Sequence, residues 1–179
     1  ALTRSGRRIT GATLDNGREI TADAYVSNMD PMHLYGELLD PAPLVSRTKR
    51  RLASTSMGLF VLYFGTDRAY PDIAHHTIWL GERYKELLRD IFDRKVLSED
   101  FSLYLHRPTA TDPSFAPDGH DSFYVLAPVP NLEGNIDWAT EGPRLQQRII
   151  EALEASIMPG LSAHVRAPFF MTPEHFREN

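Results

Sequence analysis

The stretch SMGLFVLYFGTDRAYPDIAHHTIWLGERY at residues 56–84, with the stretch EDFSLYLHRPTATDPSFAPDGHDSFYVLAPVPN at residues 99–131, decides the fold of this chain. Both stretches consist of apolar, aromatic runs separated by Pro, Asp and Gly, which is the pattern of β-strands joined by turns. They predict three or four strands with one helix inserted. Neither stretch contains a nucleophile–base pair or a metal-ligand cluster, so we expect any reaction here to be carried by a bound group.

The predicted fold class is α+β, with a mostly antiparallel, mixed sheet covered by helices on one face. Amphipathic spacing of apolar residues predicts two long helices, over 82–96 and 143–158. Asp30 and Pro31 favour the start of a shorter helix as N-cap and first helical residue, and a further helix is expected over 43–52. The predicted sheet strands cover residues 59–65, 101–106, 123–128 and 165–171, with a short strand at 77–80.

An Asn16-Gly17 turn between apolar runs predicts a β-hairpin near the beginning of the chain. A hairpin alone is only marginally stable in water, so this one is expected to join a larger sheet. We therefore interpret the chain as an internal fragment of a longer enzyme, and the alternative is a small protein that begins on a hairpin.

Composition excludes several classes of protein. The chain has 179 residues, of which 42% are hydrophobic, a formal net charge of −5 and no cysteine. The acidic balance argues against a general nucleic-acid binder. Without cysteine there is no disulfide framework and no thiolate metal site, which is compatible with a reducing compartment. No apolar run approaches the roughly 20 residues of a membrane-spanning helix.

Several motifs, in a fixed order, resemble the bacterial and fungal-type phytoene desaturases. They are SxGLFVLYFG (56–65), IAHHT (73–77), GxRYxEL (81–87), EDFSLYLHxPTxTDPSxAPxG (99–119), YVLAPVPNL (124–132), NIDWATEGPRLQQRI (135–149), MPGL (158–161) and TPEHF (172–176). DNGREITADAYVSNMDP at 15–31 is similar to the family's link between its flavin domain and its substrate domain. The resemblance covers essentially the whole chain.

This resemblance implies an FAD-dependent carotenoid desaturase with an amine-oxidase-like fold. Residues 1–30 would be a hairpin and linker of the flavin domain, and residues 31–179 a substrate-binding domain truncated at its C-terminus. Desaturation removes a hydride and a proton from a C40 polyene, and no side chain accepts a hydride, so FAD would be required in the parent. FAD is not expected in this fragment, because no two glycines are closer than five positions and the G-x-G turn is missing. Asn28 and Asp30, near the flavin domain, are weak cofactor-binding candidates.

Apolar and aromatic strand residues are the candidates for lining a substrate tunnel. They are Phe60, Leu62, Phe64, Tyr104, His106, Tyr124 and Leu126. Strand alternation places Tyr104 and His106 on one face and Leu103 and Leu105 on the other. The Tyr/His face either lines a ligand cavity or meets solvent or another domain, and the pattern does not decide between these alternatives.

His106 and Arg107 are the catalytic candidates, because a His or Arg near a flavin stabilises charge or takes a proton. The alternative is a polar pair bonded to backbone at a strand end. His75 and His76 suggest a metal pair, but adjacent side chains on an extended segment point apart and no third ligand has a useful spacing. We therefore predict no metal site.

The remaining expectations concern partners. The basic residues Arg47, Lys49, Arg50 and Arg51 form either a solvated helix face or a contact with an anionic membrane. The parent would be cytoplasmic and peripherally membrane-associated, with a hydrophobic polyene as substrate. Loss of the covering flavin domain would favour self-association of the fragment through an apolar face. The competing functions are a related flavin amine oxidase or carotenoid isomerase fragment, and a noncatalytic apolar-ligand or interaction domain.

Overall fold

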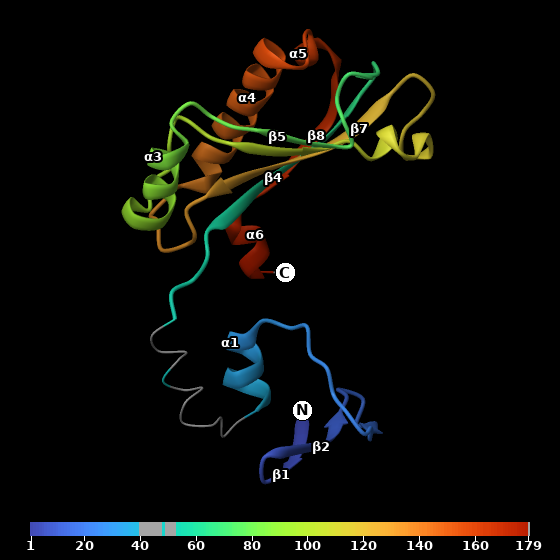
Figure 1. Cartoon of the computed structure of the whole chain (residues 1–179), viewed down its shortest axis with the longest axis vertical. Coiled ribbons are helices and arrows are strands. Elements are labelled where there is room, and N and C mark those ends of the chain that lie inside the picture. The colour runs from blue at the N-terminus through green and yellow to red at the C-terminus, as the bar shows by residue number, and fades with distance from the viewer. Residues whose placement is uncertain (40–47, 49–52, 179) are drawn as a thin grey trace. The chain divides into compact units, whose positions relative to one another are not determined.

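A computed structural model describes residues 1–39, 48 and 53–178 of the chain (Figure 1). The chain divides into two compact units, Ala1–Ser54 and Thr55–Asn179. The assignment of residues 1–30 to a flavin domain and of residues 31–179 to a substrate-binding domain stays a prediction.

The first unit contains a three-stranded antiparallel sheet in the order β1-β2-β3. Its strands are β1 (Leu2–Ser5), β2 (Arg8–Thr13) and β3 (Glu19–Ile20). The predicted hairpin is confirmed between β2 and β3, where Thr13 pairs with Glu19. Gly17 has a φ of +79°, which L side chains rarely adopt, and the Arg18 amide donates to Asn16 Oδ1 at 3.0 Å. The predicted two-strand ribbon is thus completed by β1, a strand whose short mixed sequence LTRS shows no clear strand pattern.

Asp30 starts the helix of the first unit, as its sequence predicts. Its Oδ1 accepts from the amides of Met32 at 2.7 Å and His33 at 3.2 Å, and α1 (Pro31–His33) continues as a π-helical turn over Leu34–Leu38. The cap uses two amides that have no partner inside the helix. The helix expected over 43–52, and the basic residues Arg47, Lys49, Arg50 and Arg51, lie outside the described residues.

A five-stranded sheet in the order β5-β6-β7-β4-β8 forms the centre of the second unit (Figure 1). Its strands are β4 (Gly58–Thr66), β5 (His76–Trp79), β6 (Leu103–His106), β7 (Asp121–Val129) and β8 (Val165–Met171). Every pairing is antiparallel, which confirms the predicted α+β class and all the predicted strands of this sheet. The longest pairing joins β4 to β7 from Gly58↔Val129 to Thr66↔Asp121.

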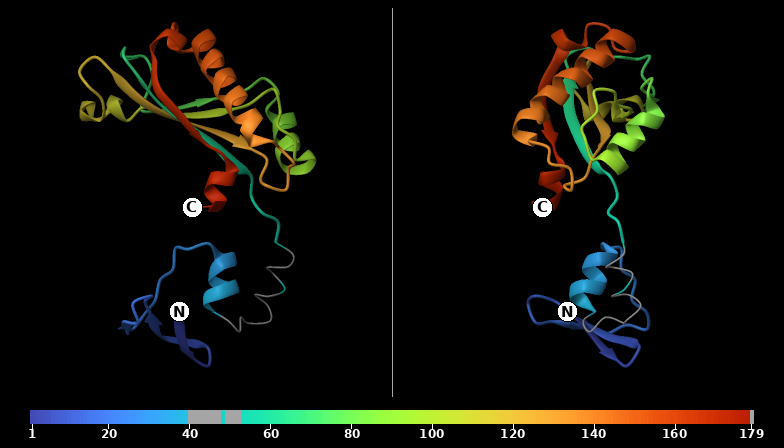
Figure 2. Two further views of the ribbon diagram at one scale, coloured as in Figure 1. Left: turned by 180° about the vertical axis from the view of Figure 1, so that it is seen from behind. Right: turned by 90° about the vertical axis from the view of Figure 1, so that its left-hand side faces the viewer.

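Helix α4 (Trp138–Ser156) covers one face of this sheet (Figure 2). It begins at Trp138, one and a half turns before the predicted start at Pro143, because the Asp137 side chain caps it by accepting from the Ala139 amide at 3.2 Å. Side chains that are almost fully buried fill the space between α4 and the sheet. They include Phe60, Leu62, Leu105, Val125, Ala127, Leu145, Ile149 and Leu153.

The second predicted helix is shorter than expected and lies beside one end of the strands (Figure 1). It consists of α3 (Tyr84–Arg89) and a π-helical turn over Asp90–Arg94, and it ends at Lys95, whose φ is +55°. Leu87 and Ile91 are buried, but outside the core cluster that contains α4. The unit closes with α5 (Leu161–His164) and α6 (Pro173–Glu178). Among the described residues, no helix has both the length and the apolarity needed to cross a bilayer.

Candidate functional site

A row of aromatic rings crosses the face of the five-stranded sheet opposite α4. Phe169 on β8 stacks on Tyr63 with centroids 4.8 Å apart. Tyr63 lies 5.8 Å from Tyr124, and Tyr124 lies 6.0 Å from Tyr104. Histidines continue the row toward β5. We call these six residues the aromatic row: Phe169, Tyr63, Tyr124, Tyr104, His106 and His76.

Strand register produces this row. Tyr63 is directly opposite Phe169 and Tyr124 in the neighbouring strands, and His106 is opposite Tyr124 and His76. Directly opposed residues share a face of the sheet, and their Cβ atoms lie about 5 Å apart. Each strand therefore contributes at least one ring to the same line. The row is accessible at both edges: Phe169 is 52% exposed, and His76 on β5 is also exposed.

The seven predicted substrate-binding residues lie on opposite faces of the sheet. Phe60 and Leu62 have no exposed surface and Phe64 has 3%, because all three point into the core beneath α4. Phe60 also stacks on Phe170 at 5.1 Å.

Tyr104, His106, Tyr124 and Leu126 are half-buried and lie on the other face, with the aromatic row. The seven residues therefore do not line one common surface. A role in substrate binding for any of them stays a prediction.

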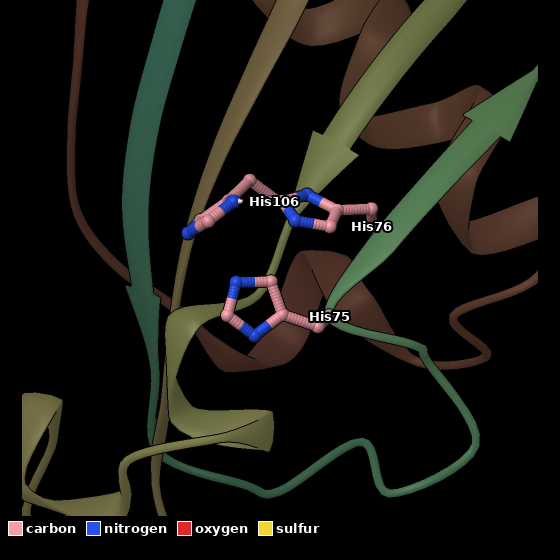
Figure 3. Close-up of side chains that lie close together, drawn as sticks. All are labelled: His75, His76 and His106. Atoms are coloured by element: carbon pink, nitrogen blue, oxygen red, sulfur yellow. Dashed lines mark hydrogen bonds between the residues drawn. The ribbon is translucent and has the colours of Figure 1, made fainter.

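Three histidines gather at the β5–β6 end of the row (Figure 3). His75, His76 and His106 each offer one ring nitrogen, and these nitrogens all lie within 4.8 Å of one another. Nδ1 of His76 is 3.3 Å from Nδ1 of His106, and the rings of His75 and His106 meet edge to face at 4.6 Å.

The expectations that His75 and His76 point apart and that no third ligand has a useful spacing are therefore wrong: the two rings lie with their centroids 4.4 Å apart, and His106 joins them. His75 lies in a bend before β5 begins at His76, so the alternation of an extended strand does not separate the two rings. The third histidine, His106, is 30 residues away from His76 in the chain but opposite it in the sheet.

Hydroxyl groups contact the three histidines, and burial shifts the pKa values of His106 and Tyr124. Tyr104 Oη lies 2.6 Å from His76 Nδ1 and 3.3 Å from His106 Nδ1, and His75 Nδ1 contacts the Thr111 hydroxyl. Burial, followed by the charges of His75 and His76, lowers the pKa of His106. Burial, followed by the neighbouring Tyr104 hydroxyl, raises the pKa of Tyr124. These shifts favour neutral rings along the row.

Arg107, the other catalytic candidate, points away from the aromatic row. Its Nε lies 3.0 Å from Oδ2 of Asp121, and its side chain is 11% exposed against 2% for the carboxylate. Arg107 Nη1 also donates to the Ile73 carbonyl at 2.9 Å. The Arg107 guanidinium is thus held in a buried ion pair, which is a structural role, and no separate observation supports catalysis by it.

The residues of this chain do not by themselves fit a dinucleotide cofactor. A pyrophosphate needs a glycine-rich turn at a helix N-terminus, and the nearest glycines of the chain are five positions apart. Asp30 Oδ1 is engaged by the amides of its own helix. Cofactor contacts of Asn28 and Asp30 stay a prediction.

Sequence reasoning missed Tyr63, Phe169 and the joining of the three histidines. The alternation of Tyr63 with Phe60, Leu62 and Phe64 was a usable signal for Tyr63 and places it on the face away from the core. No local signal identified the histidine cluster, because it depends on the pairing of β5 with β6.

Comparison with known proteins identifies relatives over most of the chain. Residues 1–154 match the family described as flavin containing amine oxidoreductase. The chain is 51% identical, over 96% of its length, to a lycopene-forming phytoene desaturase of Paracoccus sp., of which it covers 35%. It is 41% identical, over 99% of its length, to a neurosporene-forming phytoene desaturase of Rhodobacter capsulatus, again covering 35%. It is 34% identical, over 92% of its length, to a 4,4'-diapophytoene desaturase of Methylomonas sp., covering 32%. The chain therefore spans about a third of the length of these relatives.

Proposed function

Because the chain belongs to the family of flavin-containing amine oxidoreductases, we propose that it is part of a carotenoid desaturase and that its aromatic row contacts the polyene substrate. The observation that carries the substrate class is the 51% identity to a phytoene desaturase over nearly the whole chain. Relatives named for three different products support a desaturase rather than an oxidase of amines.

The aromatic row suits a long hydrocarbon. Neighbouring strands are about 4.8 Å apart, so a line of rings across five strands extends over roughly 19 Å. A polyene offers no hydrogen-bond acceptor and is held by dispersion and burial, which ring faces supply. The Tyr104 hydroxyl already has a partner within the row, because it lies 2.6 Å from Nδ1 of His76.

This chain would therefore bind and orient the substrate, while the redox step belongs to the longer parent protein. In the parent, FAD would accept the hydride, and the flavin domain would close over the aromatic row. We further propose that the parent is a cytoplasmic protein bound peripherally to the membrane, since a hydrocarbon substrate partitions into the bilayer. In the isolated chain, the uncovered row would promote self-association.

A chimeric enzyme tests the proposal. This chain replaces the matching third of the Paracoccus phytoene desaturase, and the chimera is expressed in a host that accumulates phytoene. We expect it to form coloured carotenoids, because the replaced segment and this chain are 51% identical in sequence. Leu126→Lys and Tyr124→Lys in the chimera should abolish product formation, since each places a charge in the path of the hydrocarbon.

The matched control is Gln147→Lys on the exposed side of α4, which adds the same side chain on the other side of the sheet. It should leave product formation unchanged, and all variants should retain bound flavin, measured by absorption of the purified proteins. Wild-type product formation by both row variants would contradict the assignment of the aromatic row to substrate binding. An inactive chimera that retains flavin would contradict the assignment of the chain to a carotenoid desaturase.

A further inference from the structure

We propose that His75, His76 and His106 form a binding site for a divalent transition-metal ion, with zinc as the reference ion. Two of its residues, His76 and His106, belong to the aromatic row, so the site overlaps one end of the proposed polyene contacts. Binding of a metal ion there does not depend on the proposed function. It lies at the end of the aromatic row formed by the start of β5 and the end of β6 (Figure 3).

The spacing of two nitrogens matches what a metal requires. Zinc binds imidazole nitrogen at about 2.0–2.1 Å, so two ligands at a tetrahedral angle are about 3.3 Å apart. The two Nδ1 atoms of His76 and His106 are 3.3 Å apart. The third nitrogen, from His75, lies within 4.8 Å of the other two, so a ring rotation that moves it by about 1.5 Å completes a three-ligand set.

Backbone pairing holds the ligands in place before any metal binds. His76 and His106 are directly opposed in the β5–β6 ladder, and the Arg107 amide donates to the His75 carbonyl at 2.9 Å. The backbones of all three histidines are therefore held by main-chain hydrogen bonds between the two segments. A site built on a paired strand end loses little conformational freedom when it binds a ligand.

The donor set selects the class of metal. Three imidazoles without a carboxylate suit zinc, copper and nickel, whereas calcium and magnesium require oxygen ligands.

The surroundings supply the remaining features of a metal site. Tyr104 Oη contacts both Nδ1 atoms, so an ion bound by these two nitrogens would replace their hydrogen bonds to this hydroxyl, and the Thr111 hydroxyl contacts Nδ1 of His75. His76 is exposed, which gives an ion a path to the site. Three protein ligands leave a fourth position for water, as in open zinc sites.

Calorimetric titration of the 179-residue chain with zinc chloride tests the proposal. The chain is first treated with a chelator and dialysed at pH 7.5. We expect saturable binding of one zinc ion per chain, and no heat of binding with magnesium. The single variants His75→Gln, His76→Gln and His106→Gln should each weaken zinc binding at least tenfold, because each removes one of three ligands.

His120→Gln is the matched control, since His120 is another exposed histidine of the same unit, in the loop before β7. It should bind zinc like the unchanged chain, and circular dichroism should show that all four variants are folded. Sedimentation at equimolar zinc should give the same molecular mass as without zinc, which separates a site within one chain from a bridge between chains.

Three results would overturn the proposal. They are absence of saturable zinc binding, equal affinity in the three ligand variants and the unchanged chain, and loss of binding in His120→Gln equal to that in His106→Gln. Each result remains informative whether or not the chimeric desaturase is active, because zinc affinity is measured without substrate or flavin.

Discussion

Replacement of Asp121 by Asn should severely destabilise the second unit. The Asp121 side chain is 2% exposed and pairs with Arg107, whose Nε is 3.0 Å away. It also accepts from the Tyr70 amide at 2.6 Å and from the Thr109 hydroxyl. Asn preserves the shape but removes the negative charge, and it turns one acceptor into a donor that faces other donors.

The expected loss follows from the burial of both partners. Removing one member of a buried ion pair costs about 3–5 kcal/mol, because the other charge is left without compensation. With a urea m-value of about 1.5 kcal/mol/M, the midpoint of unfolding should fall by about 2–3 M. In a domain whose total stability is about 5–15 kcal/mol, this loss is a large fraction.

Urea unfolding followed by circular dichroism measures the effect, with Asp118→Asn as the matched control. Asp118 is exposed in the loop that precedes β7, and its replacement should change stability by about 0.5 kcal/mol or less. Adding Arg107→Met to Asp121→Asn should restore part of the lost stability, because it removes the uncompensated charge. A loss below about 1 kcal/mol in Asp121→Asn, or additive losses in the double variant, would refute the structural role assigned to Arg107.

Three further predictions concern the core, the pH dependence and the cofactor. Phe60→Ala should lower the free energy of unfolding by about 3–5 kcal/mol because the ring is fully buried. Phe169→Ala, on the other face of the sheet, should lower it by about 0.5–1.5 kcal/mol. Equal losses in urea unfolding would show that the two faces are misassigned. A hydrogen bond from Arg94 lowers the pKa of Asp90 below its ordinary value of 3.8, so the stabilisation is complete above that value and is lost as the pH falls through the folded pKa. The difference in Tm between the unchanged chain and Asp90→Asn should therefore shrink as the pH is lowered from about 5 to about 3, and a constant difference would contradict this cause. The purified chain should carry no FAD, and a visible spectrum with stoichiometric flavin would disprove this.

Local patterns of the sequence predicted most secondary structure of the second unit. The apolar run at Gly58–Thr66 and the alternation at Asp121–Val129 are strands in the structure. The Asn16-Gly17 turn and the Asp30 cap are also present. These features depend on residues within one turn or a few positions, so the chain carries their signal locally. The start of α4 was misplaced because Pro143 is a strong first-turn residue, yet Asp137 caps the helix earlier.

By itself, the sequence determined the strands, the main helix and the resemblance to carotenoid desaturases. Tertiary structure decided which strand face is core, placing Phe60 beneath α4 and Tyr124 in the aromatic row. It also brought His106 to His76, and Arg107 to Asp121. Alternation along a strand distinguishes two faces without stating what covers either, and strand pairing joins residues whose separation in the chain leaves no local pattern. The aromatic row and the histidine cluster are therefore products of register, which forms only when the whole sheet assembles.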